Sequence, residues 1–505
     1  MFPSLTLIPS PELIIGLVAP IGVDLDIVTK AVSQALVEMQ YAVSEFRITD
    51  LMRDIPIDMP LAQSPFIKSY TDRIAYANEV RMRLGSDALA ALAITALRAF
   101  RRKSNESEKA EAYRPLAAHA YILRQFKRPE EIILLRRVYG RQFVLISAFA
   151  PPDTRKAVIA DKEARSNSLL SSATESENRA NDLVAQDAKE AQATHGQNVR
   201  DAFPLADVIV DATTSSKCEQ QIRRFIHLLF GSNRITPTHD EYGMYLAKSA
   251  SLRTADLSRQ VGAAIFTFSG EVATLGTNEV PKSGGGTYWT DDPNDQRDWV
   301  KRYDPNDQRQ IEILSDLLLR LKLSGHLSHA LSEKPDAELA AFLLSSRETN
   351  SVSGSMVMDL LEFGRIIHAE MSAITDAARK GISVKDGSLY CTTFPCHMCA
   401  KHIVSSGLKK VIYLEPYQKS YALRLHSDSI VVDAEGNGKV SFNTFIGISP
   451  YRYRDLFERR DKRKSADGSF LEWCEGRPRP NIELYYPAYL EAEERVAANF
   501  HHILQ

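Results

Sequence analysis

The chain has 505 residues, of which 44% are hydrophobic and 25% charged, and its 62 basic and 64 acidic side chains give a formal net charge of -2. This is the composition of a globular protein of two or three domains, and the near-neutral charge argues against broad electrostatic binding of nucleic acid. Five cysteines are too few for a disulfide framework and favour a reducing, cytoplasmic compartment. No Lys or Arg precedes Lys30, and no apolar stretch is long enough to span a bilayer, so we expect neither a signal peptide nor membrane association.

The N-terminal residues predict a strand, a glycine-containing turn and a helix. An apolar run at 13–18 precedes the turn, and apolar residues recur at helical spacing from 24 to 39. This order is typical of a phosphate-binding loop, in which Gly16, Gly22 and Asp24 would be the contact residues. The lysine and hydroxyl residue of the complete motif are missing after Gly22, so we expect a degenerate loop without phosphoryl transfer. A plain α/β turn without a ligand is the alternative.

Further strands and helices alternate up to about residue 235. We predict a long helix at 70–100, strands at 142–149 and 208–211, and a helix at 218–230. Strands separated by helices favour a doubly wound parallel sheet, which makes residues 1–235 a P-loop-like domain. Residues 161–200 are polar and predict a mobile or lid-like insertion. Its last part, His195 to Arg200, is either a loop that meets a ligand or partner or an ordinary loop.

Residues 236–505 predict a second α/β/α domain with a mixed sheet. The expected elements are a helix, a hairpin turning at Ser269-Gly270, and later strands alternating with helices: 242–253, 260–266, 271–275, 388–392, 410–414 and 439–445. An insertion at about 283–363 interrupts this order. It contains an amphipathic helix at 308–323, whose leucine spacing favours a core or an interface.

Two short motifs within the second domain carry the chemistry. His368 is followed two residues later by Glu370, and Cys396 and Cys399 form a C-x-x-C pair directly after a proline. One imidazole and two thiolates can hold a zinc ion with a fourth position open for water, and Glu370 remains as the acid/base. This pattern is the signature of zinc-dependent deaminases of cytosine or adenine. We therefore predict Zn²⁺ as the cofactor and Glu370 as the catalytic residue.

A structural zinc site is the alternative interpretation of these motifs. Structural zinc normally has four protein ligands, and here the fourth would have to come from His397 or His402. His397 lies between the two cysteines, where a helix would turn its side chain away from theirs. The residue types and spacing favour the catalytic site.

Several segments resemble the cytidine and deoxycytidylate deaminase superfamily, over roughly residues 242 to 428. The likeness to the deoxycytidylate branch rests on the two metal motifs and on the stretches 256–263, 276–281 and 406–413. By this resemblance Asn278 would hydrogen-bond the sugar and base region of the substrate. The family usually has a tyrosine where this chain has Thr277.

The whole chain resembles a narrower group, the bacterial antiviral deoxycytidine-nucleotide deaminases with an N-terminal P-loop kinase-like domain. Segments 195–201, 205–207 and 249–253 belong to that likeness. The resemblance implies deamination of dCTP and/or dCMP, depletion of dCTP in antiviral defence, and assembly into a homo-oligomer. It also implies a nucleotide or a small regulatory RNA as a partner of the N-terminal domain.

Phosphate recognition requires cations beside the pocket. The candidates are Arg253 and Arg259 before the first strand of the second domain, and Tyr417 with Lys419 after a later strand. Each of these charges could equally be a solvated surface residue. Two other functions are weighed: a deaminase acting on cytosine or adenine in single-stranded DNA or RNA, and a nucleotide-sensing regulatory protein whose zinc is structural. The near-neutral charge disfavours the first, and the missing P-loop residues disfavour the second.

Overall fold

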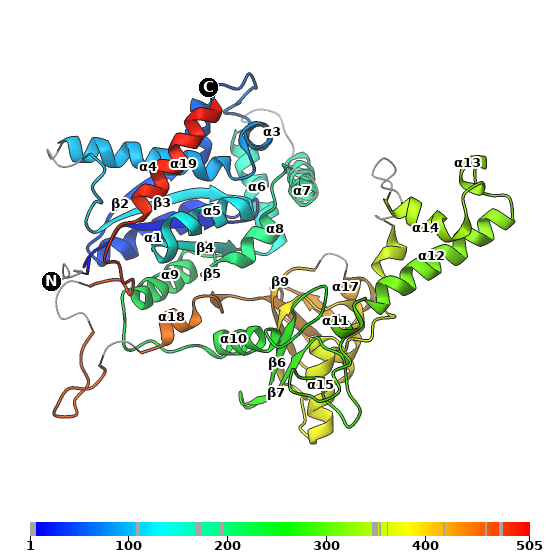
Figure 1. Ribbon diagram of the computed structural model, residues 1–505. Helices are drawn as coiled ribbons and strands as arrows, with labels where there is room; N and C mark the ends of the chain where they lie inside the picture. The colour runs from blue at the N-terminus through cyan, green and yellow to red at the C-terminus, as the bar shows by residue number, and fades with distance from the viewer. Residues whose placement is uncertain are drawn as a thin grey trace, which may run out of the picture. The chain divides into compact units, whose positions relative to one another are not determined.

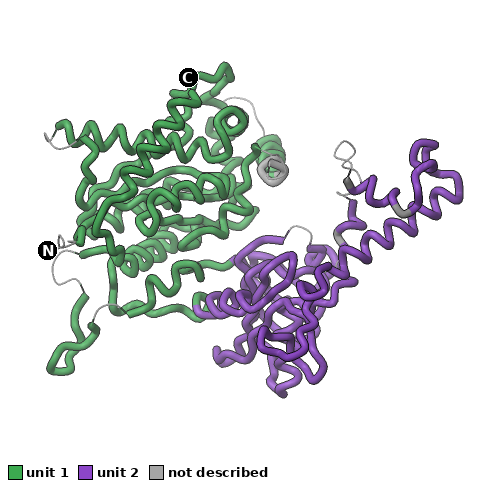
Figure 2. Tube along the Cα trace, viewed as in Figure 1, with its two compact units in different colours: residues 1–241, 445–505 green, residues 242–444 purple. Residues whose placement is uncertain are grey.

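The computed structural model describes residues 7–107, 112–166, 173–190, 195–345, 352, 355–360, 362–417, 420–459, 462–473 and 478–504. The chain forms two compact units, residues 1–241 with 445–505 and residues 242–444 (Figure 2). We expected the second domain to run from 236 to 505, and that extent was wrong. The chain returns to the first unit at 445. There a short strand at 447–448 pairs with a strand of the first unit's sheet, and a long helix at 489–504 packs against another helix of that unit. None of the described helices is long and apolar enough to cross a membrane.

The first unit is built on a six-stranded sheet in the order β12-β5-β4-β1-β3-β2 (Figure 1). Its strands are β1 (Leu13–Val18), β2 (Ala42–Arg47), β3 (His119–Phe126), β4 (Phe143–Phe149), β5 (Val208–Asp211) and β12 (Gly447–Ile448). The first five are parallel, as predicted for a doubly wound sheet, whereas β12 pairs antiparallel with β5 and makes the sheet mixed. The sequence analysis missed β2, β3 and β12.

Helices cover both faces of this sheet. On one face α1 (Leu25–Glu38) and α9 (Ser215–Leu229) bury their apolar residues in the main core of the unit. On the other face α4 (Ala88–Ser107), α5 (Pro129–Tyr139) and α19 (Tyr489–Leu504) pack together (Figure 1). The remaining helices of the unit are α2 (Ile48–Leu51), α3 (Phe66–Leu84), α6 (Pro152–Ser166), α7 (Ala173–Glu190), α8 (Val199–Ala202) and α18 (Tyr453–Phe457).

Two expectations about helices in this unit require correction. The predicted helix at 70–100 is two helices, because Gly85 adopts φ 106° between α3 and α4 and ends the first of them. Residues 161–200 were expected to be mobile or lid-like, yet their described part includes the C-terminal end of α6 and all of α7. Leu183 of α7 is buried against Ile21 and Ile159, so this segment has a small core of its own.

A buried charge network joins the two ends of the chain within the first unit. The guanidinium of Arg101 lies 3.0 Å from Glu12 and 2.7 Å from Glu493, and all three side chains are almost fully buried. Tyr121 and Tyr489 donate further hydrogen bonds to Glu12 at 2.7 and 2.6 Å. Arg101 therefore links α19 to α4 and to the residue before β1.

The second unit has a mixed six-stranded sheet in the order β10-β11-β9-β8-β6-β7. Its strands are β6 (Gly262–Phe266), β7 (Val272–Thr277), β8 (Ser388–Thr393), β9 (Lys410–Glu415), β10 (Ile430–Val432) and β11 (Val440–Thr444). The predicted hairpin is confirmed: β6 and β7 pair antiparallel, and Gly270 in their turn has φ 87°. Strands β8, β9, β11 and β10 run parallel.

Two helices, α15 (Ala369–Lys380) and α16 (His397–Ser405), pack together on this sheet. The helix α10 (His239–Ser251) leads into the unit, and α17 (Ala422–Leu425) follows β9. The insertion contributes α11 (Asp298–Lys301), α12 (Pro305–Leu323), α13 (His329–Ser332) and α14 (Asp336–Ser345). Leu314 and Leu318 of α12 form a separate small core with Leu339 of α14, as the leucine spacing predicted.

Candidate active site

The two metal motifs lie at the N-terminal ends of the adjacent helices α15 and α16. His368 is the N-cap residue of α15, and Glu370 lies in its first turn. Cys396 is the N-cap residue of α16, which follows β8 after a short loop, and Cys399 lies in the first turn of α16. Backbone N–H groups in the first turn of a helix have no intrahelical partner, so this position stabilises thiolates.

His368, Cys396 and Cys399 come together as one group of potential metal ligands. The His368 Nδ1 atom lies 3.3 Å from the Cys396 sulfur and 3.4 Å from the Cys399 sulfur. All three ligand atoms lie within 4.8 Å of one another, and the group is the one cluster of this kind among the described residues. One nitrogen and two sulfur ligands suit Zn²⁺, and three protein ligands leave a coordination position for water. The residues therefore fit the zinc that the sequence predicted.

Glu370 completes this site without being one of the ligands. Its side chain is 4% exposed, and its Oε2 atom accepts a hydrogen bond from the Cys399 thiol at 3.4 Å. Burial raises the pKa of Glu370, because a carboxylate loses hydration there. Hydrogen bonding with Cys399 and with the His368 ring, together with the charge of that ring, lowers the pKa of Cys396 to about 4, whereas burial raises the pKa of Cys399. Zinc binding requires both thiols to be deprotonated, and this frees the Glu370 oxygen from the thiol.

The alternative of a four-ligand structural site finds no support at the two histidines considered. His397 points its Nε2 atom at Glu362, 3.4 Å away, and its ring lies edge-on to that of Tyr421. Neither His397 nor His402 joins the ligand cluster among the described residues. The spacing argument, which placed His397 on a different side of α16 from the cysteines, is consistent with this placement.

A cavity of about 330 Å³ opens beside the ligands, and it contains several of the predicted substrate residues. Asn278, Arg259 and Tyr417 line it together with His368 and Glu370. The Asn278 amide is already bonded to the protein: it donates to Asp256 at 2.5 Å and to the Arg259 carbonyl at 2.8 Å, and it accepts from the Val261 N–H at 2.7 Å. In this structure Asn278 therefore fixes the loop at 256–261 that forms one wall of the cavity.

The predicted cations divide between two places. The Arg259 side chain is exposed at the cavity and lies over the Tyr417 ring, 5.5 Å from its centroid, so these two residues come together as expected. Lys419 lies outside the described residues. Arg253 does not reach this cavity and lines a different one. We therefore remove Arg253 from the candidate substrate contacts.

The sequence analysis missed a set of carboxylates in the cavity wall. Asp256 comes from the loop before β6, and the others come from the insertion: Asp298, Asp304 and Asp307. Burial raises the pKa of Asp256, Asp298 and Asp307, and the negative charge of Asp304 adds to each of these shifts. Arg365 partly offsets this charge through an ion pair of 2.9 Å with Asp298. No local signal identified these residues, because the fold brings them in from a segment far from the metal motifs.

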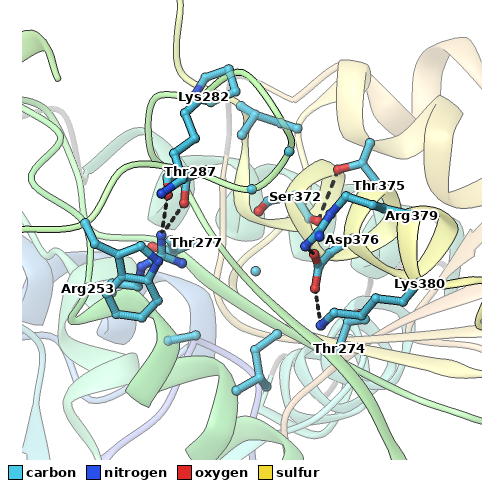
Figure 3. Close-up of a pocket in the computed structure, with 18 of the residues that line it drawn as sticks. Arg253, Thr274, Thr277, Lys282, Thr287, Ser372, Thr375, Asp376, Arg379 and Lys380 are labelled. Atoms are coloured by element: carbon cyan, nitrogen blue, oxygen red, sulfur yellow. Dashed lines mark hydrogen bonds and ion pairs between the residues drawn. The ribbon is translucent and has the colours of Figure 1, made fainter. Parts of the chain in front are cut away.

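The larger cavity of the unit, about 910 Å³, is lined by the α15 face that follows Glu370 and by β7 (Figure 3). Arg253 stacks on the Trp289 ring at 3.6 Å, and Arg379 and Lys380 both pair with Asp376. This cavity contains none of the metal ligands. Its size does not make it the candidate active site, because none of its lining residues belongs to the metal cluster.

The residues predicted for a degenerate P-loop occupy the expected strand, turn and helix in the first unit. Gly16 lies within β1, and a side chain there would collide with Phe143. Gly22 has φ 87°, and its Cα faces the backbone of Arg155 in α6. Asp24 caps the N-terminus of α1 by accepting a hydrogen bond from the Asp26 N–H at 3.1 Å.

Residues 237–415 match the family described as "Cytidine and deoxycytidylate deaminase zinc-binding region". This part of the chain is similar to the cytidine and deoxycytidylate deaminases. These are zinc-dependent hydrolytic deaminases, and the His368, Cys396 and Cys399 cluster is where this deaminase region can hold its zinc.

Curated relatives match the chain over short segments. The deoxycytidylate deaminase of Enterobacteria phage T4 is 50% identical over 54 residues, which are 11% of this chain and 28% of that protein. ComE operon protein 2 of Bacillus subtilis is 34% identical over 90 residues, covering 15% of this chain and 48% of that protein. The human deoxycytidylate deaminase is 28% identical over 106 residues, 17% of this chain and 58% of that protein. The chain therefore spans less than two thirds of the length of each of these relatives.

Among solved structures, the dCMP deaminase from the cyanophage S-TIM5 aligns with 42% of this chain and 99% of its own, at 18% identity and a TM-score of 0.22. We base no argument on a similarity at that score. The assignment of the deaminase region rests on the sequence match and on the geometry of the ligand cluster.

Proposed function

We propose that the protein catalyses the hydrolytic deamination of deoxycytidine nucleotides, converting dCTP and/or dCMP with water to the uracil nucleotide and ammonia. The observation that carries this proposal is the convergence of one imidazole, two thiols and a spare buried carboxylate at one cavity. The match to the deaminase family gives the reaction class. Several matched relatives are deoxycytidylate deaminases, and this supports the substrate class.

The reaction requires protons to move between water, the base and the leaving amine. Zinc, when bound, supplies Lewis-acid activation of a water molecule. Glu370 is placed to accept a proton from that water as its oxygen adds to C4 of the cytosine ring. The protonated carboxyl then delivers that proton to N3, takes up the remaining proton of the added hydroxyl and passes it to the amino group, so that the C4–N bond breaks and ammonia leaves.

Recognition of the phosphate is assigned to Arg259. Its guanidinium is exposed at the cavity and stacks over Tyr417, which holds it in place without neutralising its charge. The carboxylates of the insertion line the same cavity and oppose an anionic ligand. We therefore expect Arg259 to be needed for nucleotides more than for the uncharged nucleoside.

The wider role proposed for the protein is depletion of dCTP in antiviral defence, with a degenerate P-loop domain as the first unit. The resemblance of the whole chain to antiviral deaminases supports the first part. The order of strand, glycine turn and helix at 13–38 supports the second. Control by a nucleotide or a small RNA at the first unit, and assembly into a homo-oligomer, belong to the same proposal.

A substrate panel tests the proposal directly. Zinc-loaded protein is incubated with deoxycytidine, dCMP, dCTP and a cytosine-containing oligonucleotide, and ammonia release and the uracil product are measured. We expect turnover of dCMP or dCTP at rates well above those of the oligonucleotide, and loss of turnover in Glu370→Gln. Turnover of the oligonucleotide alone, or unchanged turnover in the variant, would contradict the proposal.

A further inference from the structure

The start of α12 brings negative charge without a matching cation into the candidate active site. Asp304 and Asp307 line the cavity of about 330 Å³ that also contains His368 and Glu370. Among the described residues neither Asp304 nor Asp307 forms an ion pair. Arg365 lies in the same wall, but it is already paired with Asp298 at 2.9 Å. The two carboxylates of α12 therefore present uncompensated charge to the cavity.

A helix start explains part of this pattern. Asp304 is the N-cap residue of α12, and its carboxylate accepts a hydrogen bond from the Asn306 N–H at 2.8 Å. The partial positive charge of a helix start also favours carboxylates in its first turn, where Asp307 lies. It does not require the uncharged acceptors that lie beside these two carboxylates.

Two side-chain amides on α12 add oxygen atoms to this acidic wall. Gln310 is 4% exposed, and its Nε2 atom donates to the Leu360 carbonyl at 2.7 Å and to the Met358 carbonyl at 3.3 Å. These bonds use both amide hydrogens and so fix the orientation of the amide. Its Oε1 atom is left without a hydrogen-bond partner in the described part of the chain, and Gln310 lines the cavity.

Asn306 repeats this arrangement one turn earlier on the helix. Its Nδ2 atom donates to the same Leu360 carbonyl at 2.9 Å, and its Oδ1 atom has no partner. Residues three and four apart on a helix are neighbours, so Asp307, Asn306 and Gln310 lie next to one another. Buried oxygens are normally satisfied by a donor or a cation, and this group supplies only acceptors. The wall therefore has the chemistry of a cation site.

The proposed substrate makes such a cation necessary. Apart from Glu370, four carboxylates and only two guanidiniums line the cavity, so the negative phosphates of a nucleotide meet a wall of like charge. Mg²⁺ removes this repulsion, because it takes oxygen ligands and is usually bound by one or two carboxylates together with the phosphates of a substrate. Binding of that kind needs no complete set of protein ligands.

We propose that the start of α12 binds Mg²⁺ carried by the phosphate chain of the nucleotide. Asp304 and Asp307 provide the carboxylates, and the Gln310 Oε1 atom accepts a hydrogen bond from water on the ion. A triphosphate chain can enclose the ion and still reach the wall, whereas a monophosphate offers it a single group. The protein therefore selects dCTP, as its Mg²⁺ complex, over dCMP. This inference rests on the proposed function and deepens it by naming the form of the substrate.

Calorimetric titration of the full-length, zinc-loaded protein tests this site. Glu370→Gln is the background, so that turnover does not interfere. dCTP and dCMP are titrated with and without millimolar Mg²⁺ in metal-depleted buffer that contains no chelator, so that zinc is retained. The test variant is Asp307→Asn, since Asp304 also caps the helix. The matched control is Asp316→Asn, which removes the same charge from a position on α12 that is paired with Arg320 and does not line the cavity.

Mg²⁺ should tighten dCTP binding at least about tenfold in the background protein and in the control, but less than about threefold in Asp307→Asn. The affinity for dCMP should change less than about threefold throughout, which shows that the cavity is intact. Mn²⁺ serves as a second probe. Electron paramagnetic resonance should detect about one bound Mn²⁺ per chain only when dCTP is present, and Asp307→Asn should lose this signal.

Equal affinity for dCTP with and without Mg²⁺ would overturn the proposal. The same gain in Asp307→Asn as in the control would also overturn it, because the ion would then stay on the phosphate chain without touching the wall. If the wild-type protein still deaminates dCMP or dCTP, either result leaves the proposed deaminase function intact. Binding of neither nucleotide, together with no turnover by the wild-type protein, would refute both.

Discussion

Replacing Glu370 by glutamine separates catalysis from metal binding and folding. The side chain is 4% exposed and lies outside the ligand cluster, so the zinc content should stay unchanged. Loss of a positioned proton-transfer group lowers turnover by about 10²–10⁴-fold, or about 2.7–5.5 kcal/mol of activation free energy. The reduction should fall on kcat, because an amide of the same shape still fills the space of the carboxylate but cannot take up a proton.

The same variant has an expected effect on folding. Burial raises the pKa of Glu370, so the folded, metal-free protein binds this proton more tightly than the unfolded chain does. Its stability therefore falls as pH rises from the unfolded pKa of about 4.3 through the raised folded value. Glutamine removes this decrease, so metal-free Glu370→Gln should be as stable as the parent at low pH and more stable at neutral pH. Ammonia release, zinc content and thermal unfolding are measured together. A variant that keeps full turnover, or that loses its zinc, would refute the reasoning.

Three other changes test the account of the two units. Cys399→Ser should abolish both zinc retention and turnover, because a completely buried thiolate ligand is lost. Atomic absorption of the purified variant measures its zinc content, and a full zinc complement would contradict this expectation. Arg259→Ala should raise the KM for dCMP or dCTP at least about tenfold and leave the KM for deoxycytidine unchanged, since only the nucleotides have a phosphate for Arg259 to bind. Equal increases of KM for nucleotide and nucleoside would show that Arg259 does not recognise the phosphate. Arg101→Met should lower the free energy of unfolding by about 3–5 kcal/mol, because it leaves Glu12 and Glu493 buried without their cation. Denaturant unfolding measures that loss, and the double variant Arg101→Met with Glu493→Gln should recover part of it. An Arg101→Met protein as stable as the parent would show that the network contributes little to stability.

The metal site was predictable because its residues are close in sequence to the helix starts that position them. His368 and Glu370 share one helix start, Cys396 and Cys399 share another, and each motif needs only one turn of helix to form. The hairpin at Gly270 and the strand before Gly22 were predictable for the same local reason. In each case short-range spacing determined the geometry.

The features that were not predictable depend on contacts between residues far apart in the chain. The Arg101 network joins residues at both ends of the chain, and β12 is a strand of two residues recognisable only by its pairing with β5. Asp304 and Asp307 line the cavity because the start of α12 lies beside it, and their sequence resembles an ordinary helix start. The break at Gly85 had a local signal, because glycine interrupts helices, but the periodicity on either side obscured it.

The most direct test of the central claim is a joint measurement of zinc content and deamination on one preparation. We predict about one zinc per chain, loss of dCMP or dCTP deamination when a chelator removes it, and recovery when zinc is restored. Protein that deaminates at the full rate after complete removal of zinc would contradict the account.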